Sequence, residues 1–451
     1  MNSNLLMTES LRAAPHGPAL AEIMAAALRA ADPAIAVRQH LRRDGDTIVV
    51  GGRAYPGVRR VVLVGAGKAG APMAHAAAEI VGDAVGAGLV IVKEGHLGEP
   101  LDPRVEIVEA AHPVPDERGA QAAARMAELL GGLREGDLAL VLISGGGSAL
   151  STWPAPGLTL AHLQAMTAAL LRCGAPIGAI NALRKHTTRL FGGQLARLAQ
   201  PAQVAALIVS DVIGSPLDVI GSGPTAPDPT TYADAWAIVQ RYELADQLPA
   251  ELTEHLRRGL AGGLPETPKP GEALWARVHN TVIASNAVAA QAALAAARER
   301  GWRAQVLTTY LEGEAREIGK VAAALAREQA QLGAPDRPAL MICGGETTVT
   351  IRGDGLGGRN QELALGAVAG LAGLPGALVV ALATDGGDGP TDAAGAVASG
   401  DTLARAGALG LAPDEFLRRN DAYHFFAPLG DLLRPGPTLT NVNDLLFVAA
   451  A

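Results

Sequence analysis

Six loops, five of which contain glycine, carry polar or charged residues that could bind anions or a metal ion. Each follows a short apolar run, which predicts a buried strand before the loop. Ligands of open parallel sheets bind outside the carboxyl ends of the strands, so these loops are the candidate site. They read GAGKAG (65–70), SGGGSA (144–149), SDVIGSPLDVIGSGP (210–224), ASN (284–286), CGGETT (343–348) and ATDGGDGPTDAAG (383–395).

The first loop fits the pattern G-x-G-x-x-G, with Gly65 and Gly67 at its start and a predicted helix after it. Its amides and the helix N-terminus could hold a phosphate or carboxylate, to which Lys68 adds a cation. A dinucleotide is disfavoured because the next strand ends on Lys93 and Glu94, beyond the spacing of about 20 residues expected for a ribose-binding acid. Tight packing of strand against helix would need the same glycines, and that alternative stays open.

The second loop places Gly145, Gly146, Gly147 and Ser148 after a buried strand. Bare amides, a hydroxyl and the start of a helix would suit the carboxylate of a substrate. A serine nucleophile is disfavoured because G-x-S-x-G is missing and no partner histidine is indicated. The loop is therefore predicted to bind the substrate rather than to attack it.

Acidic side chains follow predicted strands at Asp211, Glu346, Asp385 and Asp388. Acids flanked by glycine at strand ends can hold a hydrated Mg²⁺ that bridges nucleotide phosphates. Asp-Gly pairs are also common in ordinary turns. Because several such turns occur, a functional role is expected for Asp385, whereas both interpretations stay open for Glu346.

Arg359 lies in GGRNQE at a predicted helix start, where the helix dipole disfavours a cation. This cost suggests a bound anion, with an ordinary surface arginine as the alternative. His112 in AAHPVP and His186 in LRKH are interpreted as loop or packing histidines rather than catalytic bases.

The composition bounds the fold and the partners. A chain of 451 residues exceeds what one hydrophobic core usually supports, so two domains are expected. The composition, with 49% hydrophobic but only 3% aromatic residues, indicates an α/β protein. A net charge of −8 without a long basic run argues against nucleic acid, and no stretch is long and apolar enough for a membrane span. Cys173 and Cys343 indicate neither a disulfide framework nor zinc, and no signal peptide is predicted, which favours the cytoplasm.

Among the five lysines, Lys68, Lys93 and Lys185 lie beside glycine turns or at strand ends. In an acidic protein a few placed cations can focus an anionic substrate. A chance scarcity of surface lysines is the alternative.

Alternation of apolar runs with helical segments predicts a Rossmann-like N-terminal domain over 1–240, a parallel sheet with helices on both faces. The proline-rich stretch 241–280 is interpreted as a connection. A second α/β domain is expected over 281–451. The predicted strands are 61–64, 89–92, 106–109, 139–143, 206–209, 281–284, 339–343, 349–351 and 377–383, and the later helices lie near 286–299, 313–331 and 360–372.

Nine separated segments resemble, in order, those of the glycerate 2-kinase family, whose carboxy-terminal part is called the MOFRL domain. The resemblance runs from about residue 20 to the end of the sequence. The segments are GAGKAG, EAAHPVPD (109–116), LISGGGSAL (142–150), NALRKH (181–186), SDVIGSPLDVIGSGPTAPDPTT (210–231), CGGETTVT (343–350), GGRNQELAL (357–365), ATDGGDGPTDAAG and TNVNDL (440–445).

This resemblance implies ATP-dependent phosphorylation of D-glycerate at its 2-hydroxyl to give 2-phosphoglycerate, with Mg²⁺, in a cleft between two α/β domains. The family's active-site lysine falls on Lys68 and its arginine on Arg359, and its acidic positions fall on Asp211 and Asp385. The sequence departs from the family at Leu439, where glycine is more usual, and the role of the tail loop stays open.

The resulting hypothesis is a kinase in which Lys68 and Arg359 stabilise the transferring phosphoryl group, while Asp385 binds Mg²⁺ or takes the hydroxyl proton. The Gly145–Ser148 loop would hold the acceptor carboxylate. Rival hypotheses are an NAD(P)-dependent hydroxypyruvate reductase and a sugar-acid sensor without activity. The assembly is left between monomer and homodimer. Residues assigned to nucleotide phosphates are Gly65, Gly67, Asn286, Gly344, Gly345 and Glu346, and those assigned to the metal are Asp385 and Asp388.

Overall fold

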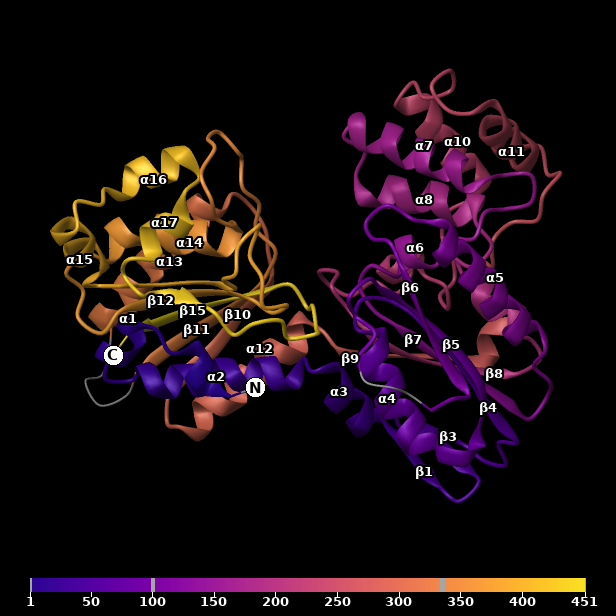
Figure 1. Cartoon of the computed structure of the whole chain (residues 1–451), viewed down its shortest axis with the longest axis horizontal. Helices are drawn as coiled ribbons and strands as arrows, with labels where there is room; N and C mark the ends of the chain where they lie inside the picture. Colours follow the sequence, from indigo (N-terminus) through magenta and orange to yellow (C-terminus); the bar gives the residue numbers. More distant parts are fainter. Residues whose placement is uncertain (1, 99–101, 333–337, 451) are drawn as a thin grey trace. The chain divides into compact units, whose positions relative to one another are not determined.

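The computed structural model describes residues 2–98, 102–332 and 338–450, in a chain of two compact units (Figure 1). The N-terminal unit comprises Pro33–Ser210 and Ser215–Ile283, and the C-terminal unit comprises Met1–Asp32, Asp211–Gly214 and Ala284–Ala451. Two α/β units were expected. The structure differs in placing the first 32 residues with the C-terminal half of the chain.

A six-stranded sheet forms the centre of the N-terminal unit, in the order β6-β5-β4-β7-β8-β9. The neighbouring strands from β6 to β8 are parallel, as predicted. Helices α4 (Gly70–Val81) and α5 (Glu117–Gly131) cover opposite faces (Figure 1). The parallel strands therefore open their carboxyl ends at one edge. Their bounds are β4 Arg60–Ala66, β5 Val85–Lys93, β6 Val105–Ala110, β7 Asp137–Ile143, β8 Gln203–Val209 and β9 Val278–Ala284.

Four helices of the same unit pack on one another around buried Leu and Tyr side chains: α7 (Leu160–Arg172), α8 (Ile177–Thr187), α10 (Tyr232–Arg241) and α11 (Ala250–Leu260). Helix α11 and the first three residues of strand β9 lie within the stretch 241–280 interpreted as a connection. That stretch is folded because its prolines bracket a helix, with Pro249 at the N-cap of α11, and Leu252 and Leu256 are fully buried.

The C-terminal unit has a mixed sheet in the order β10-β11-β15-β12-β13-β14. Only β10 and β11 are parallel, and the other neighbours are antiparallel. Helices α2 (Gly17–Ala30) and α12 (Asn286–Glu299) lie on one face, and α13 (Ala315–Leu332) and α14 (Arg359–Leu371) on the other (Figure 1). The strands are β10 Arg303–Leu311, β11 Ala339–Gly345, β12 Leu378–Ala383, β13 Gly395–Ser399, β14 Leu432–Leu433 and β15 Asp444–Ala450.

The remaining elements are short. A three-stranded sheet joins β1 (Leu41–Asp44), β2 (Thr47–Val50) and β3 (Arg53–Tyr55). The other helices are α1 Glu9–Ala13, α3 Pro33–His40, α6 Gly147–Leu150, α9 Gln194–Leu198, α15 Thr402–Ala408, α16 Pro413–Arg419 and α17 Ala422–Phe426, with 3-10 turns at Ser3–Leu6, Gly82–Ala84, Ile220–Ser222 and Ala273–Arg277. Among the described residues no helix combines the length and apolarity that crossing a membrane requires.

Two predicted strands need correction. Residues 281–284 do form a strand, but it belongs to β9 of the N-terminal sheet. Residues 349–351 form no strand, and the Ile351 side chain is 80% exposed. The β-branched residues of that stretch resemble a strand in sequence, but no sheet edge pairs with them, and they line a pocket instead.

Candidate functional site

The loops after β4 and β7 are joined at the edge of the N-terminal sheet. Lys68 N donates a hydrogen bond to Gly145 O at 2.9 Å, and Ala69 N donates to Ser144 Oγ at 3.1 Å. Gly67 has a φ of +143°, and a Cβ on it would lie 2.1 Å from Ser144 Oγ. Glycine at this position is therefore required for the close approach of the two loops.

The main-chain amides of the first loop are already used by the protein itself. Besides the amides of Lys68 and Ala69, Gly67 N donates to Ile91 O at 3.0 Å. Gly65 lies inside β4, where a Cβ would come within 2.5 Å of Leu142 O. The predicted phosphate cradle of Gly65 and Gly67 is thus not what the loop offers, and its available group is the Lys68 side chain.

The second loop has main-chain N–H groups that are available to a ligand. In the described part of the chain, no acceptor is bonded to the amides of Gly145, Gly146 or Ser148, whereas Gly147 N donates to Ser144 O at 3.3 Å. Gly146 has a φ of +85°, and turns of this kind direct successive amides toward one point, as in anion-binding nests. The geometry agrees with the substrate-binding role predicted for this loop.

Two basic side chains, Lys68 and His112, lie beside Gly146 of the second loop. A Cβ on Gly146 would lie 3.0 Å from His112 Cδ2 and 3.4 Å from Lys68 Cγ, and His96 Nδ1 lies 3.0 Å from Lys68 O. Burial, together with the charges of Lys68, Lys93 and His96, lowers the pKa of His112 to about 4. The imidazole of His112 is therefore neutral at pH 7, beside two lysines.

The hydroxyl of Ser148 is held by a chain of hydrogen bonds through Ser222 to Asn181. Ser148 Oγ lies 2.9 Å from Ser222 Oγ, which donates to Asn181 Oδ1 at 3.1 Å. Ser222 is fully buried with a φ of +60°, so the turn after β8 is held in an unusual conformation that presents this hydroxyl. The chain of hydroxyls fixes the orientation of Ser148.

His186 is not part of this loop cluster. It is buried on α8, with Nδ1 2.8 Å from Ala182 O and Nε2 3.3 Å from Glu266 Oε2. Its edge packs against the Tyr232 ring. The packing role predicted for His186 agrees with these contacts.

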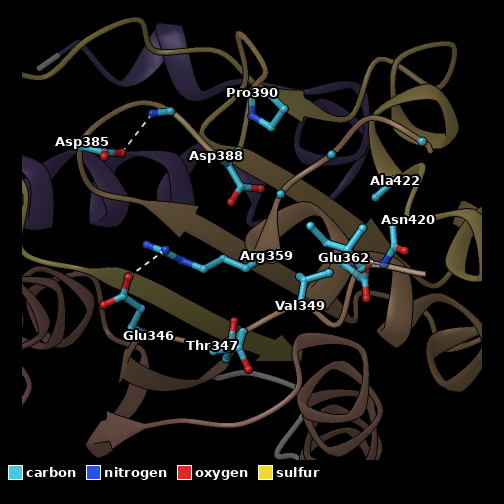
Figure 2. A pocket seen from close by; sticks show the side chains of 17 residues that line it. Glu346, Thr347, Val349, Arg359, Glu362, Asp385, Asp388, Pro390, Asn420 and Ala422 are labelled. Carbon is cyan, nitrogen blue, oxygen red and sulfur yellow. Dashed lines mark hydrogen bonds and ion pairs between the residues drawn. The ribbon is translucent and has the colours of Figure 1, made fainter. Parts of the chain in front are cut away.

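The C-terminal unit contains a pocket of about 730 Å³ (Figure 2). The loop after β11, the start of α14, the loop after β12 and the segment before α17 form its walls. Figure 2 shows the Arg359 side chain reaching across the pocket toward Glu346, with Asp385 and Asp388 on the opposite side. Its polar lining is Glu346, Arg359, Glu362, Asp385, Asp388 and Asn420, and its apolar lining includes Val349, Ile351, Pro390 and Ala422.

Two carboxylates hold the Arg359 guanidinium. Nε and Nη2 donate to Asp444 Oδ2 and Oδ1 at 2.5 and 3.0 Å, and Nη1 lies 2.7 Å from Glu346 Oε1. Although burial opposes it, these contacts hold the pKa of Arg359 above its ordinary value. The cost of a cation at a helix start is therefore offset by the protein's own acids, and does not by itself indicate a bound anion.

Asp388 caps helix α14. Its Oδ1 accepts hydrogen bonds from Asn360 N at 3.1 Å and Asn360 Nδ2 at 3.2 Å, and its Oδ2 accepts from Gln361 N at 2.9 Å. Burial raises the pKa of Asp388 against these bonds. A carboxylate at this position complements the helix dipole, which explains why an acid lies here.

Asp385 is different from Asp388. It is exposed, and within the described residues its carboxylate accepts one hydrogen bond, from Gly387 N to Oδ1 at 3.1 Å. Across the described residues, no cluster of three or more His, Cys, Asp or Glu side chains is arranged to hold a metal ion. Mg²⁺ is commonly held by one or two carboxylates together with substrate phosphates and water, so Asp385 fits such a role better than Asp388.

Three predicted residues meet around Asn443. Its Nδ2 donates to Glu346 Oε2 at 2.9 Å and to Asp211 O at 2.8 Å. Since Glu346 also pairs with Arg359, the structure brings Asp211, Glu346 and Arg359 into one neighbourhood of the C-terminal unit. Asn443 has a φ of +64°, a conformation that asparagine tolerates.

Asn286, Gly344 and Gly345 serve packing in this structure. Asn286 is buried, and its Nδ2 donates to Val442 O and Asp444 O, each at 2.9 Å. A Cβ on Gly344 would lie 1.6 Å from Asn286 Oδ1, and one on Gly345 would lie 2.1 Å from Leu311 O. These residues fix the tail loop and the strand pairing, and they do not line the pocket.

Sequence reasoning missed Asp444 and Asn443, and it used Lys93 and His112 only in passing. Asp444 and Asn443 lie in the TNVNDL segment, so that motif was the signal that could have identified them. The open question about Leu439 has a physical basis: its φ is +60°, where glycine is favoured, and its side chain is 50% exposed.

Two known protein families match parts of this chain. The family described as "Domain of unknown function (DUF4147)" matches residues 19–257, and the "MOFRL family" matches residues 339–444. The D-glycerate 2-kinase of Thermotoga maritima is 43% identical over 86% of this chain and 90% of its own length. A "putative hydroxypyruvate reductase" of Agrobacterium vitis is 42% identical, with 94% and 92% covered.

A solved structure agrees with the sequence matches. The crystal structure of glycerate kinase from Thermotoga maritima superposes with a TM-score of 0.85 at 39% identity, covering 95% of this chain and 98% of that chain. Both the sequence and the fold extend across nearly the whole of these relatives. The chain belongs to the glycerate 2-kinase family, with a DUF4147 region followed by a MOFRL region.

Proposed function

We propose that this protein is an ATP-dependent kinase that phosphorylates D-glycerate on its 2-hydroxyl, giving 2-phospho-D-glycerate and ADP. The observation that carries the proposal is the 43% identity, over most of both chains, to a protein named D-glycerate 2-kinase. Phosphoryl transfer depends on positioning and on charge neutralisation rather than on a covalent nucleophile. The free amides of the Gly145–Ser148 loop and the cations Lys68 and Arg359 supply groups of that kind.

The pocket of the C-terminal unit is the proposed nucleotide site. Its volume of about 730 Å³ lies within the usual range for small-molecule and cofactor sites, and it combines an apolar wall with a few polar groups. Val349, Ile351 and Pro390 offer apolar contact to a base, and the exposed part of Arg359 offers a cation to phosphates. Asp385 would hold Mg²⁺, which neutralises phosphate charge when bound.

Lys68 and Arg359 are assigned to the transferring phosphoryl group, and Asp211 and Asp385 remain the candidates to accept the hydroxyl proton. Arg359 is fixed for this task because Asp444 grips two of its nitrogens. Lys68 is fixed through its main chain, which is bonded to Gly145. Preorganised cations of this kind stabilise developing charge without rearranging during the reaction.

One paired assay tests the proposal. Purified protein with D-glycerate, ATP and Mg²⁺ should release ADP, and 2-phosphoglycerate rather than 3-phosphoglycerate should form. The same protein with hydroxypyruvate and NADH or NADPH should leave the reduced nicotinamide unconsumed. Oxidation of the nicotinamide without ADP release would overturn the proposal in favour of the activity named for the Agrobacterium relative. The occupied amides of Gly67, Lys68 and Ala69 already disfavour a pyrophosphate there.

A variant separates chemistry from folding. Lys68→Met should reduce turnover at least about 100-fold, since one preorganised charge typically contributes that much, and its thermal melting curve should match the wild type. Lys320→Met is the matched control, because Lys320 forms an exposed pair with Glu317. The proposal also includes a cytoplasmic location and a homodimer, which fractionation and light scattering would check.

A further inference from the structure

Within the residues that the structure describes, two of the five lysines lack an acidic partner, although acids outnumber lysines and arginines in the chain by 45 to 37. Among the residues that the structure describes, no carboxylate lies within 4.0 Å of the Lys68 or Lys93 ammonium group. The other three lysines are paired: Lys185 with Asp218 and Asp228, Lys269 with Glu266, and Lys320 with Glu317.

The two unpaired lysines lie at the same edge of the N-terminal sheet. Lys68 follows β4 and Lys93 ends β5, and these strands are parallel neighbours, with Ala66 opposite Ile91. His96 comes from the turn after β5 and contacts the Lys68 carbonyl. The fold therefore gathers positive charge where the carboxyl ends of its strands meet, and among the described residues no carboxylate pairs with either lysine.

His112 lies at the same edge of the sheet. It follows β6, the next strand along, and burial, followed by the charges of Lys68, Lys93 and His96, lowers its pKa. A neutral imidazole has one nitrogen that donates a hydrogen bond and one that accepts. His112 therefore brings an acceptor beside the ammonium groups and the free amides, which can only donate.

We propose that Lys93, His96 and His112 complete a subsite, with Lys68 and the free amides of Gly145, Gly146 and Ser148, that binds a small 2-hydroxy acid. The amides and the two lysines take the carboxylate, and the neutral His112 takes the hydrogen of the adjacent hydroxyl. The inference rests on the proposed function in naming this acid as the phosphoryl acceptor. It adds Lys93, His96 and His112 to the site, and it gives both the carboxylate and the hydroxyl of the substrate a partner.

The accepting nitrogen of His112 favours a hydroxy acid over a phosphate ester. A phosphate monoester dianion offers only acceptors, so it leaves that nitrogen of His112 without a partner. A 2-hydroxy acid carries a carboxylate and a hydroxyl on adjacent carbons, and a Cβ on Gly146 would sit within 3.4 Å of both His112 and Lys68. The carboxylate of such an acid can therefore accept from Lys68 while its hydroxyl donates to His112, and the two protein groups are close enough together for a molecule of three carbons.

Calorimetric titration without nucleotide tests the subsite directly, because it does not require turnover. D-lactate, propionate and inorganic phosphate serve as probes. For the wild type, D-lactate should bind at least about 10-fold more tightly than propionate, since one well-made hydrogen bond at a desolvated site is worth about 1.4 kcal/mol. In His112→Leu this ratio should fall toward one. Lys93→Met should weaken D-lactate about 10-fold or more, Lys93→Arg should recover most of it, and Lys320→Met should have no effect.

Kinetics provides the second readout. Lys93→Met should raise the KM for D-glycerate about 10-fold or more and leave the KM for ATP within about 2-fold. A larger effect on ATP, or phosphate that binds in a Lys93-dependent way while D-lactate does not, would overturn the inference. If the wild type binds D-lactate as described but releases no ADP from ATP and D-glycerate, the proposed kinase activity fails and the subsite stands.

Discussion

Among single side chains, Asp444 controls the charge state of the C-terminal pocket. Burial raises its pKa to about 6, although the bonds from Arg359 act in the opposite direction. Above that pH the carboxylate is ionised and grips two nitrogens of Arg359. Below it, the proton removes this ion pair, and Arg359 keeps only its contact with Glu346.

We therefore expect kcat to decline as the pH falls through about 6. Asp444→Asn should lower kcat at pH 8 and abolish this step, because the amide has no proton to gain in that range. The profile of kcat against pH from 5 to 8.5 measures both effects. A step near pH 6 that persists in Asp444→Asn would assign the titration to another group. Lys320→Met, whose exposed side chain does not line the pocket, should keep the step.

Leu439 provides a stability prediction at the same scale. Its φ of +60° strains a residue with a Cβ by about 1–2 kcal/mol, and its exposed side chain gains little from packing. Leu439→Gly removes the strain but also frees the unfolded chain, which costs about 0.4–1 kcal/mol. The net expectation is a C-terminal unit stabilised by about 0.5–1 kcal/mol, measured by urea unfolding.

Leu409→Gly is the matched control for this prediction. Leu409 is 55% exposed in the same unit, and its φ is −97°. Glycine relieves no strain there, so only the entropic cost remains and the variant should be destabilised. Opposite signs for the two variants would support strain at Leu439, whereas equal signs would refute it.

Among the elements, helix α8 is fastened by a buried charge. Lys185 Nζ lies 3.2 Å from Asp228 Oδ1 and 3.3 Å from Asp218 Oδ2, and both Lys185 and Asp228 are almost fully buried. Burial raises the pKa of Asp228, but Lys185 and the bonds from Thr230 and Thr267 outweigh it, so the net shift is downward. The ionised Asp228 thus stabilises the fold at neutral pH.

Lys185→Met should destabilise the N-terminal unit by about 3–5 kcal/mol, because it leaves a buried carboxylate without its cation. Thermal unfolding at pH 7 measures the loss. Since the folded pKa of Asp228 is below its unfolded value, its contribution in the wild type is present above about pH 4 and is lost as the pH falls through the folded pKa. Lys320→Met should change stability by less than about 1 kcal/mol. Similar losses for the two variants would contradict the role of burial.

The elements also show how far sequence reasoning reaches. Buried parallel strands appear as continuous apolar runs, so β4 to β8 and β12 could be predicted locally. Strand β10 alternates between half-buried and exposed residues, and β15 pairs with strands distant in sequence, so their places in the sheet depend on tertiary contacts. Residues 349–351 have strand-like residue types but lack a pairing partner.

The candidate site shows the same division. The position of the loops followed from their strands, and the Gly145–Ser148 loop does follow the buried strand β7, whereas its substrate-binding role stays a prediction. The sequence could not predict which main-chain amides remain free, because the amides of Gly67 to Ala69 donate hydrogen bonds to residues far away in the sequence. The bond between Arg359 and Asp444 likewise joins positions 85 residues apart, which spacing alone does not reveal.

On the scale of the whole molecule, the chain begins and ends in the same unit. Ser10 N and Oγ donate to Asp431 Oδ1 and Oδ2 at 2.7 and 2.8 Å, and Arg405 Nη1 lies 2.8 Å from Asp431 Oδ2. Asp431 is completely buried. Helix α2 packs on α12, so residues 2–32 supply both a polar anchor and an apolar face to a unit whose other residues come mostly after 283.

This division predicts which parts of the chain fold alone. A chain of residues 33–283 keeps its entire sheet and should unfold cooperatively by circular dichroism. A chain of residues 284–451 leaves Asp431 without Ser10 and uncovers α12, so it should lack a cooperative transition. A peptide of residues 2–32 should restore that transition, and a peptide with Ser10→Ala should bind at least about 10-fold more weakly, because it loses the hydroxyl bond to a buried charge. Cooperative unfolding of 284–451 by itself would show that the first 32 residues are not part of the unit's core.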